Sequence, residues 1–267
     1  MRPMLIYVHK TSTMQDVLTA VSRGYHWHVG GIVRADRFPG LEAKFADMYG
    51  LNRTPMQRYR ARLAGKANAR LFAHPAHRSP HFFWWLLVTE GTGTVREREQ
   101  GLREVTDAHT RITWANEFEV VRLPGTGSVP RWTWRMTRSR METWKEEIQV
   151  AIRHRRHDTA IRYVIARFHH LPGFKGVREQ VAELRRFTAL EWGRIKRNGK
   201  CPYLPPKMPG YVRFQAAPGV ASEWVVGRLC DGLPPFTDEM KFAVADKKLS
   251  TLIEAESSWG ENQNEKV

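Results

Sequence analysis

The chain has 267 residues, of which 42% are hydrophobic and 11% aromatic, so it is long enough to bury a substantial core. Its 43 Lys and Arg against 27 Asp and Glu give a formal net charge of +16 and a sequence pI near 10.3, which predicts an anionic partner, most commonly nucleic acid. A first stretch that turns polar too quickly for a signal peptide, only two cysteines and the lack of an apolar run of roughly 18–20 residues predict a cytoplasmic protein that does not bind membranes.

The first 24 residues are predicted to form a strand and a helix. Residues 2–10 have an apolar centre typical of a short strand. Thr13 stands three residues before Asp16, which is capping-box spacing, so we expect the helix to begin there and to end at Gly24.

The next predicted strand, residues 25–29, carries the main candidate site. Alternation places His26 and His28 on one face and Tyr25, Trp27 and Val29 on the other. Arg23 lies just before this strand, and Arg34 and Arg37 lie where it is expected to end. Imidazoles that transfer protons near neutral pH, surrounded by permanent cations, suit the cleavage of a phosphodiester. The alternative is that both histidines are simply solvated on an exposed strand.

Two helices are expected to follow. Residues 39–49 have helical spacing and present Lys44 outward as a candidate phosphate contact. Thr54 and Pro55 then provide an N-cap and a favoured first residue for a second helix. Its predicted apolar side consists of Met56, Tyr59 and Leu63. Arg58 and Arg62 lie on the other side, where they either contact phosphates or are merely solvated.

The middle of the chain is predicted to be rich in strands. Residues 67–72 and 81–90 have strand patterns, and the continuously apolar run 82–88 favours a position in the sheet centre. A short charged helix is expected near residues 96–105, followed by strands at 111–114, 117–123 and 131–136. In the last of these, alternation predicts that Trp132, Trp134 and Met136 share a core-facing side.

Residues 138–200 contain 16 Lys and Arg but only 7 Asp and Glu, and their apolar spacing is helical throughout. We expect a basic helical insertion that lies along the phosphates of an RNA hairpin. The candidate contacts are Arg153, Arg155, Arg156, Arg178, Arg185 and Arg186.

The sequence therefore predicts an α+β fold with a ferredoxin-like antiparallel sheet core and a basic helical insertion. The predicted parts are an N-terminal domain (1–137), the insertion (138–199), C-terminal strands that return to the core (200–249) and an acidic, mobile tail (250–267). Residues 211–214 and 224–229 are the expected returning strands, and residues 237–248 a short helix.

This plan resembles the CRISPR repeat-RNA endoribonucleases of the RAMP superfamily, among them those of type IV systems. The resemblance rests on the order of strand, helix and histidine strand, on the arginines near His26 and His28, and on the basic insertion, and it covers residues 1 to about 230. It implies recognition of a repeat hairpin with a flanking single strand, one cut beside it and retention of the product in a ribonucleoprotein complex. Family members often have a glycine-rich loop near the C-terminus, whereas the glycines from Gly210 to Gly232 are scattered.

Cleavage of this kind needs no metal and no cofactor, because a base and an acid move the protons while cations stabilise the phosphate. We expect His26, His28 and Arg23 to be catalytic and Arg34 and Arg37 to bind RNA. Residues 26–28 also match the histidine, hydrophobe, histidine triplet of metal-dependent DNA nickases, in which a tyrosine attacks DNA. A nucleic-acid-binding protein without enzymatic activity explains the charge equally well.

Overall fold

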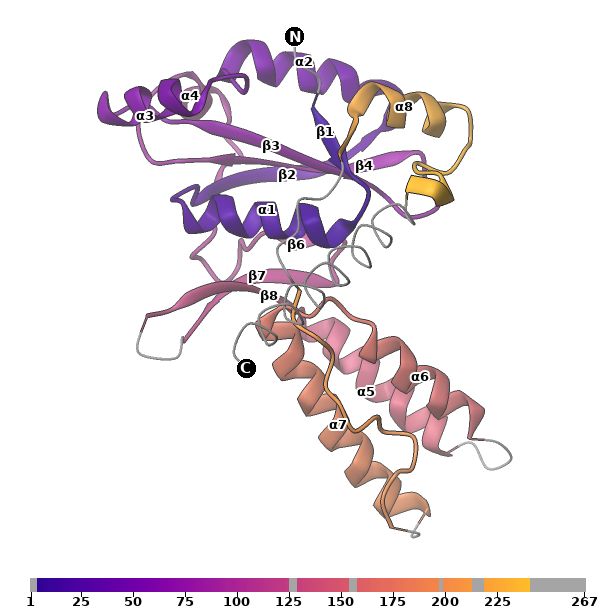
Figure 1. Cartoon of the computed structure of the whole chain (residues 1–267). Helices are drawn as coiled ribbons and strands as arrows, with labels where there is room; N and C mark the ends of the chain where they lie inside the picture. Colours follow the sequence, from indigo (N-terminus) through magenta and orange to yellow (C-terminus); the bar gives the residue numbers. More distant parts are fainter. Residues whose placement is uncertain (1–3, 125–128, 154–157, 197–198, 213–218, 241–267) are drawn as a thin grey trace, which may run out of the picture.

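The computed structural model describes residues 4–124, 129–153, 158–196, 199–212 and 219–240 (Figure 1). The strands are β1 (Leu5–Tyr7), β2 (Trp27–Arg34), β3 (Ala69–Pro75), β4 (His81–Val88), β5 (Arg103–Glu104), β6 (Thr113–Trp114), β7 (Phe118–Leu123), β8 (Arg131–Met136) and β9 (Gly219–Ala221). The helices are α1 (Lys10–Ser22), α2 (Phe38–Tyr49), α3 (Pro55–Leu63), α4 (Thr94–Arg98), α5 (Arg138–Arg153), α6 (Thr159–His169), α7 (Lys175–Lys196) and α8 (Ser222–Cys230), with a short 3₁₀ helix, η1 (Ala35–Arg37), between β2 and α2.

The main sheet has the strand order β3-β4-β2-β5, and its neighbouring strands are antiparallel. The fold is therefore α+β, as predicted. The apolar strand β4 lies between β3 and β2, as expected for a run that is covered on both faces. β1 pairs with β9 in a separate two-stranded sheet, so the expected ferredoxin-like order, with the first strand inside the main sheet, is not what the described residues form.

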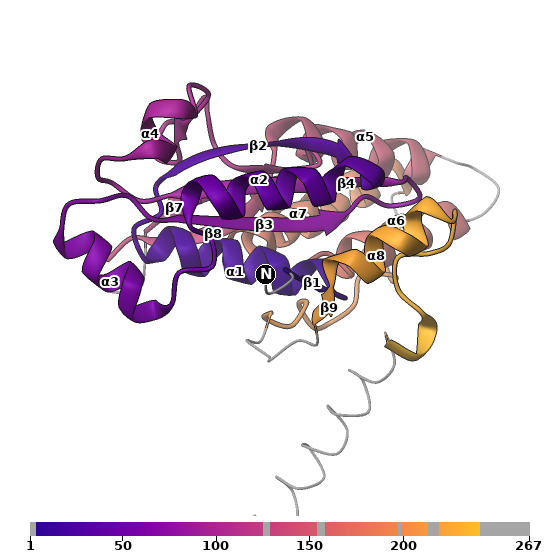
Figure 2. The same ribbon diagram turned by 90° about the horizontal axis from the view of Figure 1, so that it is seen from above.

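Helices cover both faces of the main sheet (Figure 1). One face packs against α2 and α8, with Phe38 and Phe82 stacked at a centroid distance of 4.5 Å. The other face packs against α1, whose Met14 and Val17 are fully buried. Figure 2 shows α3 and α8 at opposite ends of this layered body.

The start of α1 differs from the prediction. The helix begins at Lys10 after the extended residue His9, whose side chain makes no capping bond. Thr13 lies inside the helix instead of capping it, because its side chain is buried and its Oγ1 lies 3.4 Å from His74 Nδ1 on β3. Gly24 ends the turn after the helix with φ of 93°, as a left-handed residue after a helix should.

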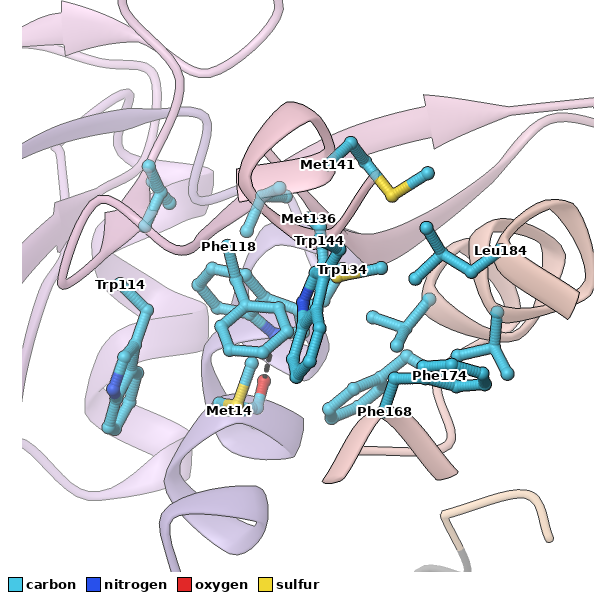
Figure 3. Packing of buried hydrophobic residues seen from close by; sticks show 14 of the residues in the cluster. Met14, Trp114, Phe118, Trp134, Met136, Met141, Trp144, Phe168, Phe174 and Leu184 are labelled. Atoms are coloured by element: carbon cyan, nitrogen blue, oxygen red, sulfur yellow. Dashed lines mark hydrogen bonds between the residues drawn. The ribbon is translucent and has the colours of Figure 1, made fainter. Parts of the chain in front are cut away.

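A second, three-stranded sheet (β6-β7-β8) lies beyond α1, and α5, α6 and α7 project from it as a bundle (Figure 1). Trp134 on β8 is fully buried and its Nε1 donates a hydrogen bond to the carbonyl oxygen of Met14 at 2.9 Å (Figure 3). One hydrophobic core runs from Met14 and Trp134 through Trp144 to Phe168 and Leu184 of the bundle (Figure 3). The predicted helices of this region are confirmed, and they share a core with the N-terminal part.

Of the two predicted C-terminal strands, the one at residues 224–229 is wrong. Residues 222–230 form the helix α8, because Val225 and Leu229 at helical spacing bury against η1 and β1. Residues 211 and 212 are not in a strand, and residues 213 and 214 lie outside the described part. The same holds for the expected mobile tail and for most of the expected helix 237–248. The short helix expected at residues 96–105 is a single turn, α4, followed by β5.

Among the described residues, no helix is both long enough and apolar enough to cross a bilayer.

Candidate functional site

The structure places His26 and His28 on the side of the main sheet that faces α1, but the side chain of His28 is buried and hydrogen-bonded and so is not accessible to a substrate. His28 is 7% exposed, and its Nε2 lies 2.6 Å from the carbonyl oxygen of Thr110. Burial lowers the pKa of His28, which favours the neutral imidazole. His26 lies just before β2, with its ring 6.0 Å from that of Trp132. Tyr25 also precedes the strand and packs on the α1 side, so it does not share a face with Trp27 as predicted.

The histidines of the predicted site lie with Arg23 at the start of β2, whereas Arg34 and Arg37 lie at its other end. His28 and Arg34 are six positions apart on the extended strand, which is about 20 Å at 3.3 Å per residue. Arg23 is exposed at the end of α1, and its carbonyl oxygen accepts a hydrogen bond from Arg62 at 3.2 Å. Because a phosphate contacts groups only a few ångströms away, one phosphate cannot touch both Arg34 and the His28 end.

A cleft of about 1650 Å³ opens at the Arg34 end instead. Five segments line it: the start of α1, the end of β2, the hairpin between β3 and β4, the turn between β6 and β7, and the loop after α8. Its basic and histidine residues are His9, Lys10, Arg34, His74, His77, Arg78 and His81. The acidic residues that line it are Asp36 and Glu117. Both lie near arginines, since Asp36 is paired with Arg34 at 3.0 Å and Glu117 lies 3.8 Å from Arg140.

The register of the main sheet brings four of these lining residues onto one face. Arg34 on β2 is directly opposite His81 on β4, and Phe83 on β4 is directly opposite His74 on β3. Side chains directly opposite one another have Cβ atoms about 4.5–5.5 Å apart. Since His81 and Phe83 alternate with the buried Phe82, both point away from the α2 side. The cleft thus has an aromatic floor with an arginine and two imidazoles beside it.

Local hydrogen bonds fix the hairpin that carries His77, Arg78 and His81. The backbone N–H of Ala76 donates to the carbonyl oxygen of His81 at 2.8 Å, and the N–H of Ala35 on η1 donates to that of Pro80 at 2.9 Å. Arg78 adopts a left-handed conformation with φ of 54° at the tip of the turn. His81 Nδ1 lies 2.7 Å from Ser79 Oγ, and no partner of its Nε2 is found among the described residues. The His81 ring is therefore oriented, with one nitrogen available.

The cleft is lined by three cationic side chains, Lys10, Arg34 and Arg78, and by two carboxylates, Asp36 and Glu117, so its positive charge is modest. Burial is the main reason that the pKa of His74 is lowered to about 3, and the charges of Lys10 and His9 add to it, so this imidazole is neutral at physiological pH. Burial also lowers the pKa of Lys10, although Glu117 acts in the opposite direction. The bond to Arg34 lowers the pKa of the exposed Asp36, which keeps its carboxylate ionised.

The structure divides the predicted RNA contacts into three groups. Arg58, which is half-buried, and Arg62, which is exposed, donate to the carbonyl oxygens of Leu51 and Arg23, both at 3.2 Å. Arg178 and Arg185 are half-buried, the first stacked 3.7 Å from the centroid of the Tyr211 ring and the second 3.0 Å from His169 Nε2. Exposed positions are held by Arg37, Lys44, Arg153 and Arg186. Arg155 and Arg156 lie outside the described residues.

The sequence interpretation missed the cleft histidines, although the sequence contains a signal for them. Three of the eleven histidines fall within the eight residues from His74 to His81, and Pro75 and Pro80 bound the turn between them. Such a short, basic, proline-bounded turn between two strands predicts a fixed hairpin that carries functional side chains. Nothing in the sequence indicated that His9 and Lys10 would join it from α1.

Comparison of the chain with protein-family models, with curated proteins and with solved structures found no match in any of the three. Within the part of the chain that the structure describes, no group of three or more His, Cys, Asp and Glu side chains has an arrangement that could hold a metal ion.

Proposed function

We propose that the protein is a metal-independent endoribonuclease that cuts hairpin RNA in the cleft at the end of β2. The observation that carries the proposal is the histidine-lined, basic cleft, in which imidazoles stand beside cations that carboxylates neutralise only in part. The activity is of the kind that the resemblance to CRISPR repeat-RNA endoribonucleases implies. The net charge of +16 supports an RNA partner, because phosphate contacts contribute much of the affinity of such proteins.

In this mechanism the substrate phosphate lies between Arg34, Lys10 and Arg78, whose positive charges stabilise the charge that builds up on its oxygens. His81 transfers one proton through Nε2, while its contact with Ser79 holds the ring in place. His9, the residue that directly precedes α1, transfers the other proton. A 2′-hydroxyl then attacks the phosphorus and the 5′-oxygen leaves, which yields a 2′,3′-cyclic phosphate. Phe83 offers its exposed part to a neighbouring base for stacking.

The helical bundle provides the surface along which the hairpin is proposed to lie. Figure 1 shows α5, α6 and α7 extending away from the sheets, so the bundle is open to a ligand of some length. Arg153 at the end of α5 and Arg186 on α7 are exposed, and Arg186 has no carboxylate partner among the described residues. Retention of the product, a cytoplasmic location and assembly with other subunits of a ribonucleoprotein complex belong to the same proposal.

The test is cleavage of an RNA hairpin with a flanking single strand by the purified full-length protein in EDTA. We expect a product that ends in a cyclic phosphate. His81→Ala and His9→Ala are each expected to lower the single-turnover rate by about 10²–10⁴-fold, the usual contribution of general acid–base catalysis, while RNA binding persists. His109→Ala, an exposed histidine outside the cleft, is the matched control.

Four results would contradict the proposal. A strict requirement for a divalent cation would exclude the metal-independent reaction, and a covalent adduct between a tyrosine and DNA would favour the nickase alternative. Loss of cleavage in Arg23→Ala and His26→Ala, with normal rates for the His9 and His81 variants, would place the chemistry at the other end of β2. Binding without cleavage of any hairpin would indicate a nucleic-acid-binding protein without enzymatic activity.

A further inference from the structure

Helix α3 presents its apolar side to solvent. Met56, Tyr59 and Leu63 are 58%, 59% and 70% exposed, and no residue of the helix is buried. Their spacing of three and four residues places them on one side of the helix, in a stripe about 10 Å long. The sequence predicted Arg58 and Arg62 on the side that is solvated or contacts phosphates, so the structure, with the apolar side in solvent, reverses the expected orientation of the helix.

The reversed orientation is fixed by hydrogen bonds. A capping box joins Thr54 and Gln57 at the start of the helix, with bonds of 2.8 and 3.2 Å. From the inner side, Arg58 and Arg62 donate to main-chain carbonyl oxygens, and the side chain of Asn68 donates to the carbonyl oxygen of Arg58 at 3.0 Å. The arginines thus attach the helix to the body and leave the apolar side outward, in a helix whose first turn is well formed.

Positive charge borders the exposed stripe on both sides. Arg60 follows Met56 by four residues and Arg62 follows Tyr59 by three, so each arginine lies beside an apolar residue on the helix surface. Both arginines are exposed, and neither has a carboxylate partner among the described residues, although Arg62 also donates to the carbonyl oxygen of Arg23. The chain has no Asp or Glu from residue 48 to residue 89, so no local acidic residue balances this charge.

We propose that α3 is a docking site for an acidic amphipathic helix of a partner protein. Such a helix offers an apolar stripe for Met56, Tyr59 and Leu63 and carboxylates for the flanking arginines, which is the helix-against-helix mode of recognition. RNA fits the surface less well, because its phosphates would pair with Arg60 and Arg62 but leave Met56 and Leu63 against a charged polymer. The site lies at the end of the body opposite α8, whose C-terminal end borders the cleft, so it is independent of the proposed cleavage (Figure 2).

The test is photo-crosslinking from position 59 in cells that naturally produce the protein, with Tyr59→p-benzoylphenylalanine in the full-length chain. The expected result is an adduct with one protein, joined at a helical segment whose apolar residues are flanked by Asp or Glu. Arg60→Glu is expected to lower the adduct yield by about fivefold or more, since it places like charges together in the interface. Arg131→Glu on β8, an exposed position that changes the net charge equally, should leave the yield within about twofold.

An adduct with nucleic acid, with a protein segment that lacks acidic residues, or with nothing would overturn the proposal. A yield that is unchanged in the triple variant Met56→Ser, Tyr59→p-benzoylphenylalanine, Leu63→Ser would do the same. These variants are expected to fold normally, because the three replaced side chains are more than half exposed. Equal thermal unfolding temperatures of the variants and the native protein would verify this.

Discussion

Two buried tryptophans, Trp134 and Trp192, differ in whether the indole N–H makes a hydrogen bond. They therefore form a matched pair for measuring how much that hydrogen bond contributes to the stability of the protein. Trp134 is 0% and Trp192 2% exposed. Trp134 Nε1 donates to the Met14 carbonyl oxygen at 2.9 Å, which links the second sheet to α1. Trp192 Nε1 is also buried, but it has no hydrogen-bond partner among the described residues.

Replacing either tryptophan by phenylalanine removes a similar apolar area, which costs about 1 kcal/mol of burial free energy. Trp134→Phe also loses a hydrogen bond with a net contribution of about 1 kcal/mol, so the free energy of unfolding should fall by about 2 kcal/mol. Trp192→Phe removes an unsatisfied donor whose burial costs about 1–3 kcal/mol, which offsets the lost area, so the variant should be nearly neutral.

The assay is thermal unfolding followed by circular dichroism in one buffer. For a chain of this size about 1 kcal/mol corresponds to about 2–4 °C, so the two variants should differ by about 4–8 °C. Equal unfolding temperatures, or a less stable Trp192→Phe, would refute the assignment of the Trp134 bond as a stabilising link between the sheet and α1.

Two further predictions concern α7 and β3. Gly176→Ala should destabilise the protein by about 1–3 kcal/mol in urea titrations, because its Cβ would lie 2.7 Å from the Trp134 carbonyl oxygen. Gly193→Ala in the same helix, with open space around it, should instead stabilise by about 0.5–1 kcal/mol, and the same sign for both would refute this packing. Because the pKa of His74 is about 3 in the folded state and 6.5 in the unfolded state, the unfolded chain binds more protons between these values and stability falls as pH falls below about 6.5. His74 should account for about 1.3 kcal/mol of the loss between pH 7.5 and 5.5, and His74→Gln should remove that part, unlike His109→Gln.

The elements that were predicted well are those with strong local signals. The apolar run of β4, the helices of the bundle and the Thr54 cap depend on neighbours in the sequence, and the structure has all of them. Residues 224–229 were misassigned because a short segment with only a few apolar residues fits a strand or a helix, and only burial against η1 and β1 decides. The position of β1 beside β9 depends on contacts across more than 200 residues, which local patterns do not encode.

The candidate site was harder to predict because it depends on distances through space. The sequence placed His28 near Arg34, but an extended strand carries residues apart faster than any other element. His81 and Arg34 are 47 positions apart in the sequence and meet only through strand register. The orientation of α3 was unpredictable for a related reason, since arginines that donate to main-chain carbonyls have the same sequence pattern as arginines that face solvent.

The continuous core between the second sheet and the bundle limits how the chain can be shortened. Trp134 and Met136 on β8 are buried in the same cluster as Trp144 and Ile148 of α5. A fragment that ends at residue 137 would therefore expose indole and thioether surface on the underside of its own sheet and would be prone to aggregate. The bundle is not a detachable module, and a fragment that transfers it to another scaffold would have to include β7 and β8.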